Sequence, residues 1–124
     1  MAISVIKNTD CSINFKISED ISSRKTVDLA GYKNFIFGLS ENNRLVIRKE
    51  FAKNEIQVWS NLDILQPYII RVLFKKTNFE NIIPNNSDEE KIRTYELFGI
   101  KNDGTTVRFC FGDFYLEESP CMSK

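Results

Sequence analysis

This chain of 124 residues has 42% hydrophobic side chains and equal numbers of basic and acidic residues, 17 of each. Such a composition fits a single globular domain over residues 1–124 and excludes a disordered chain. Zero net charge gives no support for nucleic acid or a membrane as the partner, and no repulsion opposes association with another protein or formation of a homo-oligomer.

The residue types that usually carry chemistry are scarce. There is no histidine, which removes the commonest general base and metal ligand, so we predict no cofactor and no enzyme activity. The cysteines Cys11, Cys110 and Cys121 are widely spaced without a C-x-x-C pair, which is typical of neither a zinc site nor a disulfide framework. We interpret them as reduced thiols, with a Cys110–Cys121 or Cys11–Cys121 bridge as the open alternative.

The ends and apolar runs of the chain bear on its location. The start MAISVIKNTD lacks a basic region and a long apolar run, so we do not interpret it as a signal peptide. No segment reaches the roughly 18 apolar residues that a membrane-spanning helix needs. We therefore expect a protein that is kept inside the cell that makes it, or that becomes part of a particle assembled there.

Short strands dominate the first half of the chain. Residues 3–6 predict a first strand, and Ile13, Phe15 and Ile17 alternate with polar side chains as in a half-buried strand. Residues 35–39 and 45–51 predict a hairpin. An odd loop groups the apolar side chains on one face and an even loop splits them, so we prefer the odd loop. The grouped side chains would be Phe35, Phe37, Leu39, Leu45 and Ile47.

The middle of the chain continues this pattern. Residues 55–60 predict a strand with Trp59 opposite Ile56 and Val58, and one helical turn is expected between 61 and 66 before Pro67. Residues 68–74 alternate so strongly, with a half-apolar second face, that we expect a central strand. The inward residues would be Tyr68, Ile70, Val72 and Phe74. Residues 76–93 break the alternation and predict a long loop or a short helix.

Residues 95–117 contain the strongest signal, a hairpin around Asp103-Gly104. A two-residue turn sets Ile100 opposite Val107 and Phe98 opposite Phe109. The competing three-residue loop over 102–104 sets Ile100 opposite Thr106 and sorts the faces less well, so we prefer the former. The preferred register predicts one buried face, formed by Phe98, Ile100, Val107, Phe109 and Phe111.

Seven or eight short strands without a long helical pattern predict an all-β fold, an antiparallel β-sandwich. Because exposed sheet edges and loops bind other proteins, we expect the interaction surface there. Basic side chains on neighbouring strands, together with Trp59, are the candidate surface. Its members are Trp59, Arg71, Lys75, Lys101 and Arg108, and the four basic residues would share one sheet face. A solvated sheet face is the competing interpretation. The carboxylates Asp103 and Asp113 are explained more simply by turn and bulge geometry than by acid–base chemistry.

Three segments occur in an order found in a known family. They are SINFKI (12–17) followed by TVDLAG (26–31), then IQV (56–58) leading through Leu65 and Pro67 to Tyr68, then NDGTTV (102–107) leading to GDFYL (112–116). This order resembles the immunoglobulin-like N-terminal domain of phage baseplate upper proteins. The resemblance implies an immunoglobulin-like sandwich and a structural role in a phage tail or baseplate, docking other virion proteins. It implies no catalytic residues.

Two functional hypotheses follow. The favoured one is a non-enzymatic structural or adaptor protein of a phage particle. The alternative is a small intracellular inhibitor, of anti-defence or immunity type, that binds a host protein or sequesters a nucleotide signal.

Overall fold

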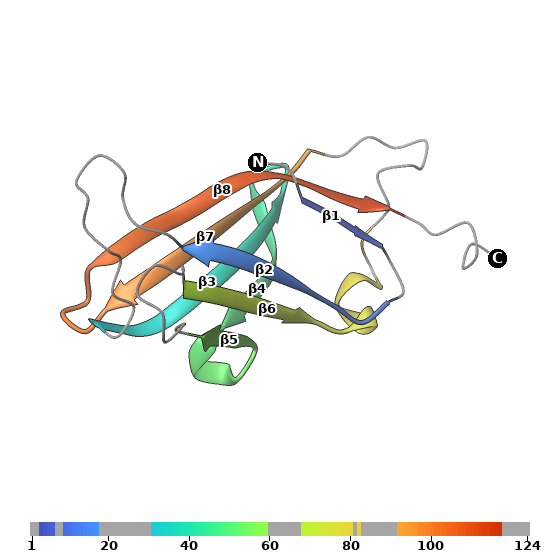
Figure 1. The fold of residues 1–124 in the computed structure, drawn as a ribbon. Helices are drawn as coiled ribbons and strands as arrows, with labels where there is room; N and C mark the ends of the chain where they lie inside the picture. The colour runs from blue at the N-terminus through green and yellow to red at the C-terminus, as the bar shows by residue number, and fades with distance from the viewer. Residues whose placement is uncertain are drawn as a thin grey trace.

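The computed structural model describes residues 3–6, 9–17, 31–59, 68–80, 82 and 92–117. Most of these residues belong to strands (Figure 1). The strands are β1 (Ile3–Ile6), β2 (Cys11–Ile17), β3 (Tyr32–Glu41), β4 (Arg44–Glu50), β5 (Ile56–Trp59), β6 (Tyr68–Phe74), β7 (Arg93–Lys101) and β8 (Thr106–Glu117). Within the described ranges, the short 3-10 helices η2 (Phe51–Lys53) and η3 (Lys76–Phe79) follow β4 and β6.

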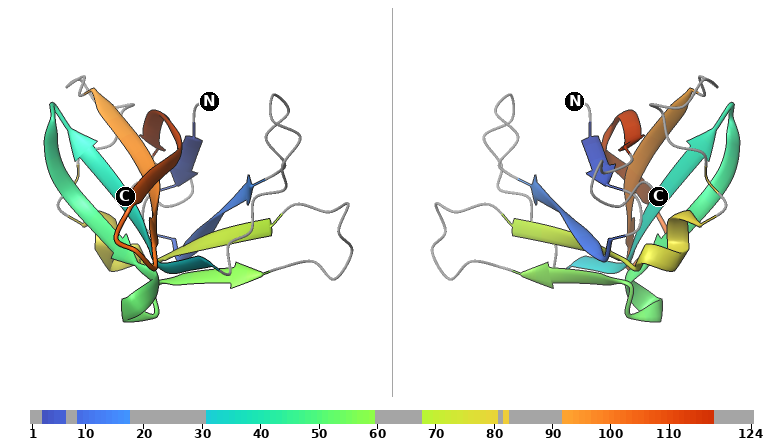
Figure 2. Two further views of the ribbon diagram at one scale, coloured as in Figure 1. Left: turned by 90° about the vertical axis from the view of Figure 1, so that its left-hand side faces the viewer. Right: turned by 90° about the vertical axis from the view of Figure 1, so that its right-hand side faces the viewer.

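The strands form two sheets that Figure 2 shows end on as the arms of a V. One sheet has five strands in the order β1-β8-β7-β3-β4, and the other has three in the order β2-β6-β5. In chain order these strands match A′, B, C, C′, D, E, F and G of an immunoglobulin domain, in which B, E and D oppose the sheet of G, F and C. The predicted all-β, immunoglobulin-like sandwich is therefore confirmed. The β1–β8 pair is parallel, whereas every other pair is antiparallel as predicted.

Three aromatic rings join the two sheets at their centre. Phe15 of β2 has its ring centroid 6.1 Å from Phe37 of β3 and 5.8 Å from Tyr95 of β7, and Phe37 lies 6.1 Å from Tyr95. All three side chains are buried. Antibody domains place a disulfide between strands B and F and a tryptophan of strand C at this position. Here packed aromatic rings connect the same three strands without a covalent bond.

The cysteines do not form this connection. Cys11 and Cys110 are free thiols, in agreement with their interpretation as reduced. Both alternative bridges involve Cys121, which lies outside the described residues.

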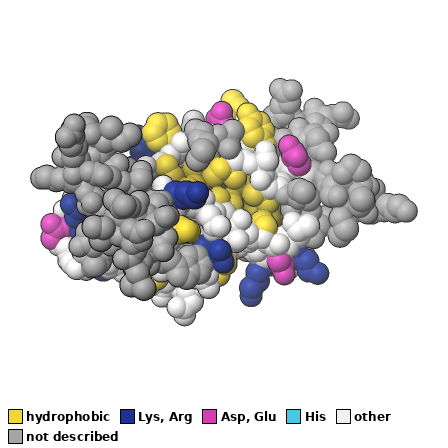
Figure 3. Space-filling view, viewed as in Figure 1, with side chains coloured by type: hydrophobic (Ala, Val, Ile, Leu, Met, Phe, Trp, Pro, Cys, Tyr) yellow, Lys and Arg dark blue, Asp and Glu magenta, His cyan; other side chains and the backbone are white. Residues whose placement is uncertain are grey.

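On the side seen in Figure 1, hydrophobic side chains are visible near the middle of the molecule, where the two sheets diverge (Figure 3).

Two buried basic side chains hold β4 and β7 in place. Lys49 Nζ donates to Asn78 Oδ1 at 2.9 Å and lies 3.6 Å from Glu55 Oε2, so it ties β4 to the segment after β6. Arg93 Nε lies 3.1 Å from Glu41 Oε2 and joins the ends of β7 and β3. Both cations are paired, as buried charges must be.

The strands around β6 follow the predicted alternation. Phe15 and Ile17 of β2 and Ile70, Val72 and Phe74 of β6 are buried. β6 is the central strand of the three-stranded sheet. Of the predicted connection 76–93, the structure describes η3, the turn residue Glu80, Ile82 and the start of β7. The expected turn over 61–66 lies outside the described residues.

The β7–β8 hairpin takes the register that we did not prefer. Ile100 pairs with Thr106, and the loop contains three residues, closed by Lys101 N–H donating to the Thr105 carbonyl at 2.8 Å. Gly104 has φ of +92°, which a glycine adopts without strain. Asp103 Oδ1 accepts the Thr105 N–H at 2.9 Å and fixes this wider loop. The two-residue turn was therefore wrong.

A β-bulge also corrects the predicted faces. Phe98 pairs with Arg108 but Leu97 pairs with Cys110, so Phe109 is the extra residue. One extra residue shifts the alternation by one position, and the even-numbered residues of β8 then point inward. Phe111 is consequently 58% exposed. The fully buried side chains of this hairpin include Tyr95, Leu97, Phe114 and Leu116. Of the predicted set, Phe109 is half-buried and packs against the core, and Val107 is half-buried, whereas Phe98, Ile100 and Phe111 lie on the opposite face.

The β3–β4 hairpin needs a similar correction. Its loop has two residues, Asn42 and Asn43, with φ of 50° and 65°, and asparagine tolerates this left-handed region. The preferred odd loop was therefore wrong. Ser40 pairs with Leu45 and Leu39 with Ile47, so Val46 is an extra residue that restores the alternation. Ile47 is buried as predicted, whereas Leu45 is 54% exposed.

Candidate functional site

The predicted surface residues do not share one face. Arg71 lies on β6 of the three-stranded sheet and Lys75 follows that strand, while Lys101 and Arg108 belong to β7 and β8 of the other sheet. The single basic sheet face was therefore wrong. Trp59 ends β5, and its side chain lies outside the described part of the chain.

Arg71 and Lys75 have local structural partners. Arg71 Nε donates to Asn14 Oδ1 at 2.9 Å across the β2–β6 pair. The backbone N–H of Lys75 donates to Asn78 Oδ1 at 2.7 Å and starts η3. Lys101 is exposed where β7 ends. Of the predicted set, Arg108 alone lies within the surface described next.

That surface, which we call the outer face, is the side of β8, β7, β3 and β4 that points away from the three-stranded sheet. The strand register arranges its side chains in rows that cross the four strands. One row reads Arg108, Phe98, Ile36 and Glu50; the next reads Phe111, Glu96, Gly38 and Arg48; a third reads Asp113, Thr94, Ser40 and Leu45.

An apolar groove crosses this outer face. It has a volume of about 280 Å³, with Ile36, Phe98 and Ile100 half-buried along it. The groove passes over Gly38, which has no side chain, and Leu45 Cδ1 lies 3.3 Å from the position that a Cβ would take there. A solvated sheet face normally carries polar side chains at such positions. Large apolar side chains beside a hollow are instead typical of protein interfaces.

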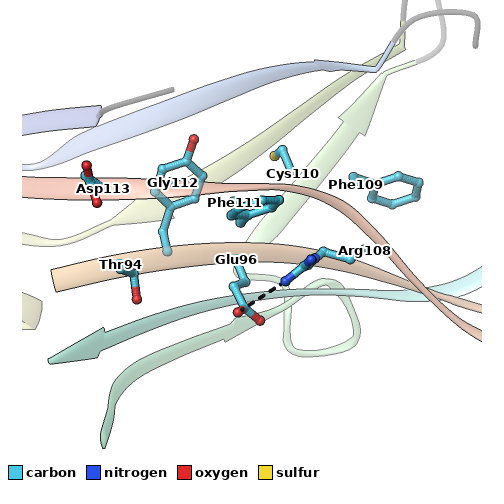
Figure 4. A pocket seen from close by; sticks show the side chains of 9 residues that line it. Thr94, Glu96, Arg108, Phe109, Cys110, Phe111, Gly112 and Asp113 are labelled. Atoms are coloured by element: carbon cyan, nitrogen blue, oxygen red, sulfur yellow. Dashed lines mark ion pairs between the residues drawn. The ribbon is translucent and has the colours of Figure 1, made fainter. Parts of the chain in front are cut away.

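A charged and aromatic cluster borders the groove on β8. The Arg108 guanidinium lies 4.2 Å from the centroid of the Phe111 ring, and Arg108 Nη1 is 3.7 Å from Glu96 Oε1. The Arg108 side chain is 49% exposed and that of Glu96 is 44% exposed. Figure 4 shows the three side chains close together, with the ion pair dashed. Exposed ion pairs contribute only about 0–1 kcal/mol, so a partner can rearrange this one at low cost.

A second groove, of about 900 Å³, runs along the β7–β8 pair. Thr94, Asp113, Glu96 and Phe111 border it on the outer face, and Cys110 also contributes to its lining. Burial raises the pKa of the Cys110 thiol above its ordinary value. This thiol therefore stays protonated at neutral pH and is a poor nucleophile.

The thiol of Cys11 resembles that of Cys110. Burial also raises the pKa of Cys11, with a smaller contribution from Asp10. Within the described ranges, no group of three or more histidine, cysteine, aspartate or glutamate side chains is placed to hold a metal ion. No helix among the described residues is long and apolar enough to cross a membrane. The outer face itself exposes aromatic, aliphatic and paired charged side chains.

Sequence reasoning placed the key residues of this surface in the core. Phe98, Ile100 and Phe111 were assigned inward because the alternation was assumed to run without interruption through residue 111. The three-residue loop over 102–104 was the available signal, since it already turns Phe98 and Ile100 outward. Gly38 carried no signal, because its role depends on Leu45 of the neighbouring strand.

Comparisons with known proteins add little to this geometry. No family model matches the sequence, and no curated protein matches it. Among solved structures, the chain is similar to murine CRIg, with 9% identity, a TM-score of 0.37, and coverage of 95% of this chain and 92% of that one. The fold assignment above depends on the strand order and register of this chain.

Proposed function

We propose that this chain is a non-enzymatic structural module that assembles with another protein subunit through its outer face. In its finer form, the proposal is that the assembly is a phage tail or baseplate, as the sequence resemblance implies. One observation carries the docking role: the outer face exposes Phe111 at 58% and Leu45 at 54% beside an apolar groove. Aromatic and arginine side chains beside a pocket are the residues that usually dominate the binding energy of protein interfaces.

The experiment has two parts, performed on particles from cells that make the chain. Purified virions or tail-like particles are first analysed by mass spectrometry for peptides of this protein. A photo-crosslinking phenylalanine analogue then replaces Phe111 in one variant and Gln57 in another. Gln57 is exposed on β5 of the other sheet, so it serves as the matched control.

We expect the chain in the particles, and crosslinks to a subunit from position 111 but not from position 57. Absence of the chain from every particle preparation contradicts the phage role. Equal crosslinking from both positions contradicts the outer face as the docking surface. Crosslinks from position 111 to a host protein outside the particle would instead support the inhibitor hypothesis.

A further inference from the structure

The outer face has the properties that a twofold symmetric interface requires. In such an interface one patch meets a copy of itself, so it must contain both members of every complementary pair. This patch carries both charge signs. Its positive side chains are Arg108 and Arg48, and its negative side chains are Glu96 and Glu50. It also carries the exposed side chains Phe111 and Leu45, together with the apolar groove that passes over Gly38. We propose that the occupant of the outer face is a second copy of this chain.

The register of the rows selects the direction of the twofold axis. An axis parallel to the strands, midway between β7 and β3, places β8 over the partner's β4 and β7 over the partner's β3. Arg108 then faces the partner's Glu50, and Phe98 faces the partner's Ile36. In the next row Phe111 faces the partner's Arg48, which is a cation–π arrangement. In the first row opposite charges and matching apolar side chains meet, and in the second row a cation meets an aromatic ring.

The perpendicular axis gives the reverse result. A twofold across the strands through the Glu96 row would place Glu96 over the partner's Glu96 and Arg48 over the partner's Arg48. Like charges held face to face in an interface are costly. Both axes keep the strands of the two packed sheets aligned within about 30°, so the charges decide between them.

The sheet edge is a poorer route to association. β4 is the outermost strand of the five-stranded sheet, and it carries the extra residue Val46 and the exposed side chains Arg44 and Arg48. Bulges and charged side chains are the devices that protect sheet edges from pairing. The β4 edge is therefore a poorer surface for association of two copies than the outer face.

The size of the patch indicates a weak dimer. Four strands spaced about 4.8 Å apart and three rows about 7 Å apart cover a footprint of a few hundred Å². Stable complexes bury about 800 Å² on each partner, so we expect dissociation constants on the order of 10–100 μM. Inside an assembled particle the local concentration of subunits exceeds this range, so a weak contact suffices there.

Sedimentation equilibrium of the purified chain, from about 10 μM to 1 mM, tests the proposal together with two variants. The average mass should rise from 14.4 kDa toward about twice that value as concentration increases. Phe111→Lys places a cation against the partner's Arg48 and should weaken association at least about tenfold. Adding Arg48→Glu to that variant restores an attractive pair and should recover most of the affinity. Tyr115→Lys is the matched control, because Tyr115 is 42% exposed on the same strand but lies outside the rows.

A second readout does not depend on how well these variants fold. The photo-crosslinker at position 111 is irradiated in an equal mixture of ¹⁴N- and ¹⁵N-labelled chains. We expect mixed-label crosslinks to the peptide that contains residues 44–49. Within one chain, β8 and β4 are three strand spacings apart, about 14 Å, so this product must be intermolecular.

A chain that stays monomeric at 1 mM overturns the proposal. So does a Phe111→Lys variant that associates normally, and so do mixed-label crosslinks that map to another segment. This inference rests on the proposed function only in taking the outer face as the docking surface. Crosslinking from position 111 to a different virion protein, with a monomeric purified chain, would reject the second copy and leave the proposed function intact.

Discussion

At the scale of single residues, Gly99 shows how closely the aromatic side chains approach the backbone. A Cβ at this position of β7 would lie 2.6 Å from Phe109 Cε2 and 2.7 Å from Tyr32 Cδ2. Those two rings also contact each other, with centroids 5.4 Å apart. We expect Gly99→Ala to destabilise the fold by about 1–3 kcal/mol through overpacking, measured by urea unfolding. Gly31→Ala is the control, since nothing lies within 4 Å of its Cβ position. Equal effects at both positions would contradict this packing.

Asp103 predicts a pH dependence. The hydrogen bond from the Thr105 backbone N–H lowers the pKa of Asp103 below its ordinary value. The folded state therefore favours the carboxylate, so its stabilisation is present above the unfolded pKa of about 3.9 and is lost as the pH falls through the lower folded pKa. Asp103→Asn should reduce the loss of urea stability between about pH 5 and pH 2. Some loss should remain, because Lys53 lowers the pKa of Glu50 as well. An unchanged pH profile would show that this hydrogen bond does not contribute.

At the scale of elements, the turns set the register of both hairpins. Asn43 has φ of 65° in the β3–β4 turn, a conformation that costs a β-branched residue about 1–2 kcal/mol. We expect Asn43→Val to lower the free energy of unfolding by that amount, while Asn43→Gly changes it by less than about 0.5 kcal/mol. Arg44→Val, one residue further in an exposed strand position, is the matched control and should be nearly neutral. Thermal unfolding followed by circular dichroism would measure all three variants, and an Asn43→Val variant as stable as the unmodified chain would argue against the left-handed turn.

At the scale of the whole molecule, twofold alternation was enough to predict the architecture. The alternating side chains of β2 and β6 identified strands, and two such groups of strands can bury their apolar faces only by stacking as layers. Alternation was not enough for the outer face. A single extra residue, Val46 in β4 or Phe109 in β8, reverses which side chains point inward, and no residue type announces it. The groove over Gly38 likewise depends on neighbours that come together only in the sheet.

The three central rings have a consequence for how fast the chain folds. The rings come from distant parts of the sequence, since Phe15 and Phe37 lie in its first third and Tyr95 in its last third. They meet only after long loops have closed. Because loop closure costs entropy before these contacts stabilise anything, the barrier to folding is high. Domains dominated by such distant contacts fold in milliseconds to seconds. No covalent bond joins β2 to β7, so these loops must close again each time the chain refolds.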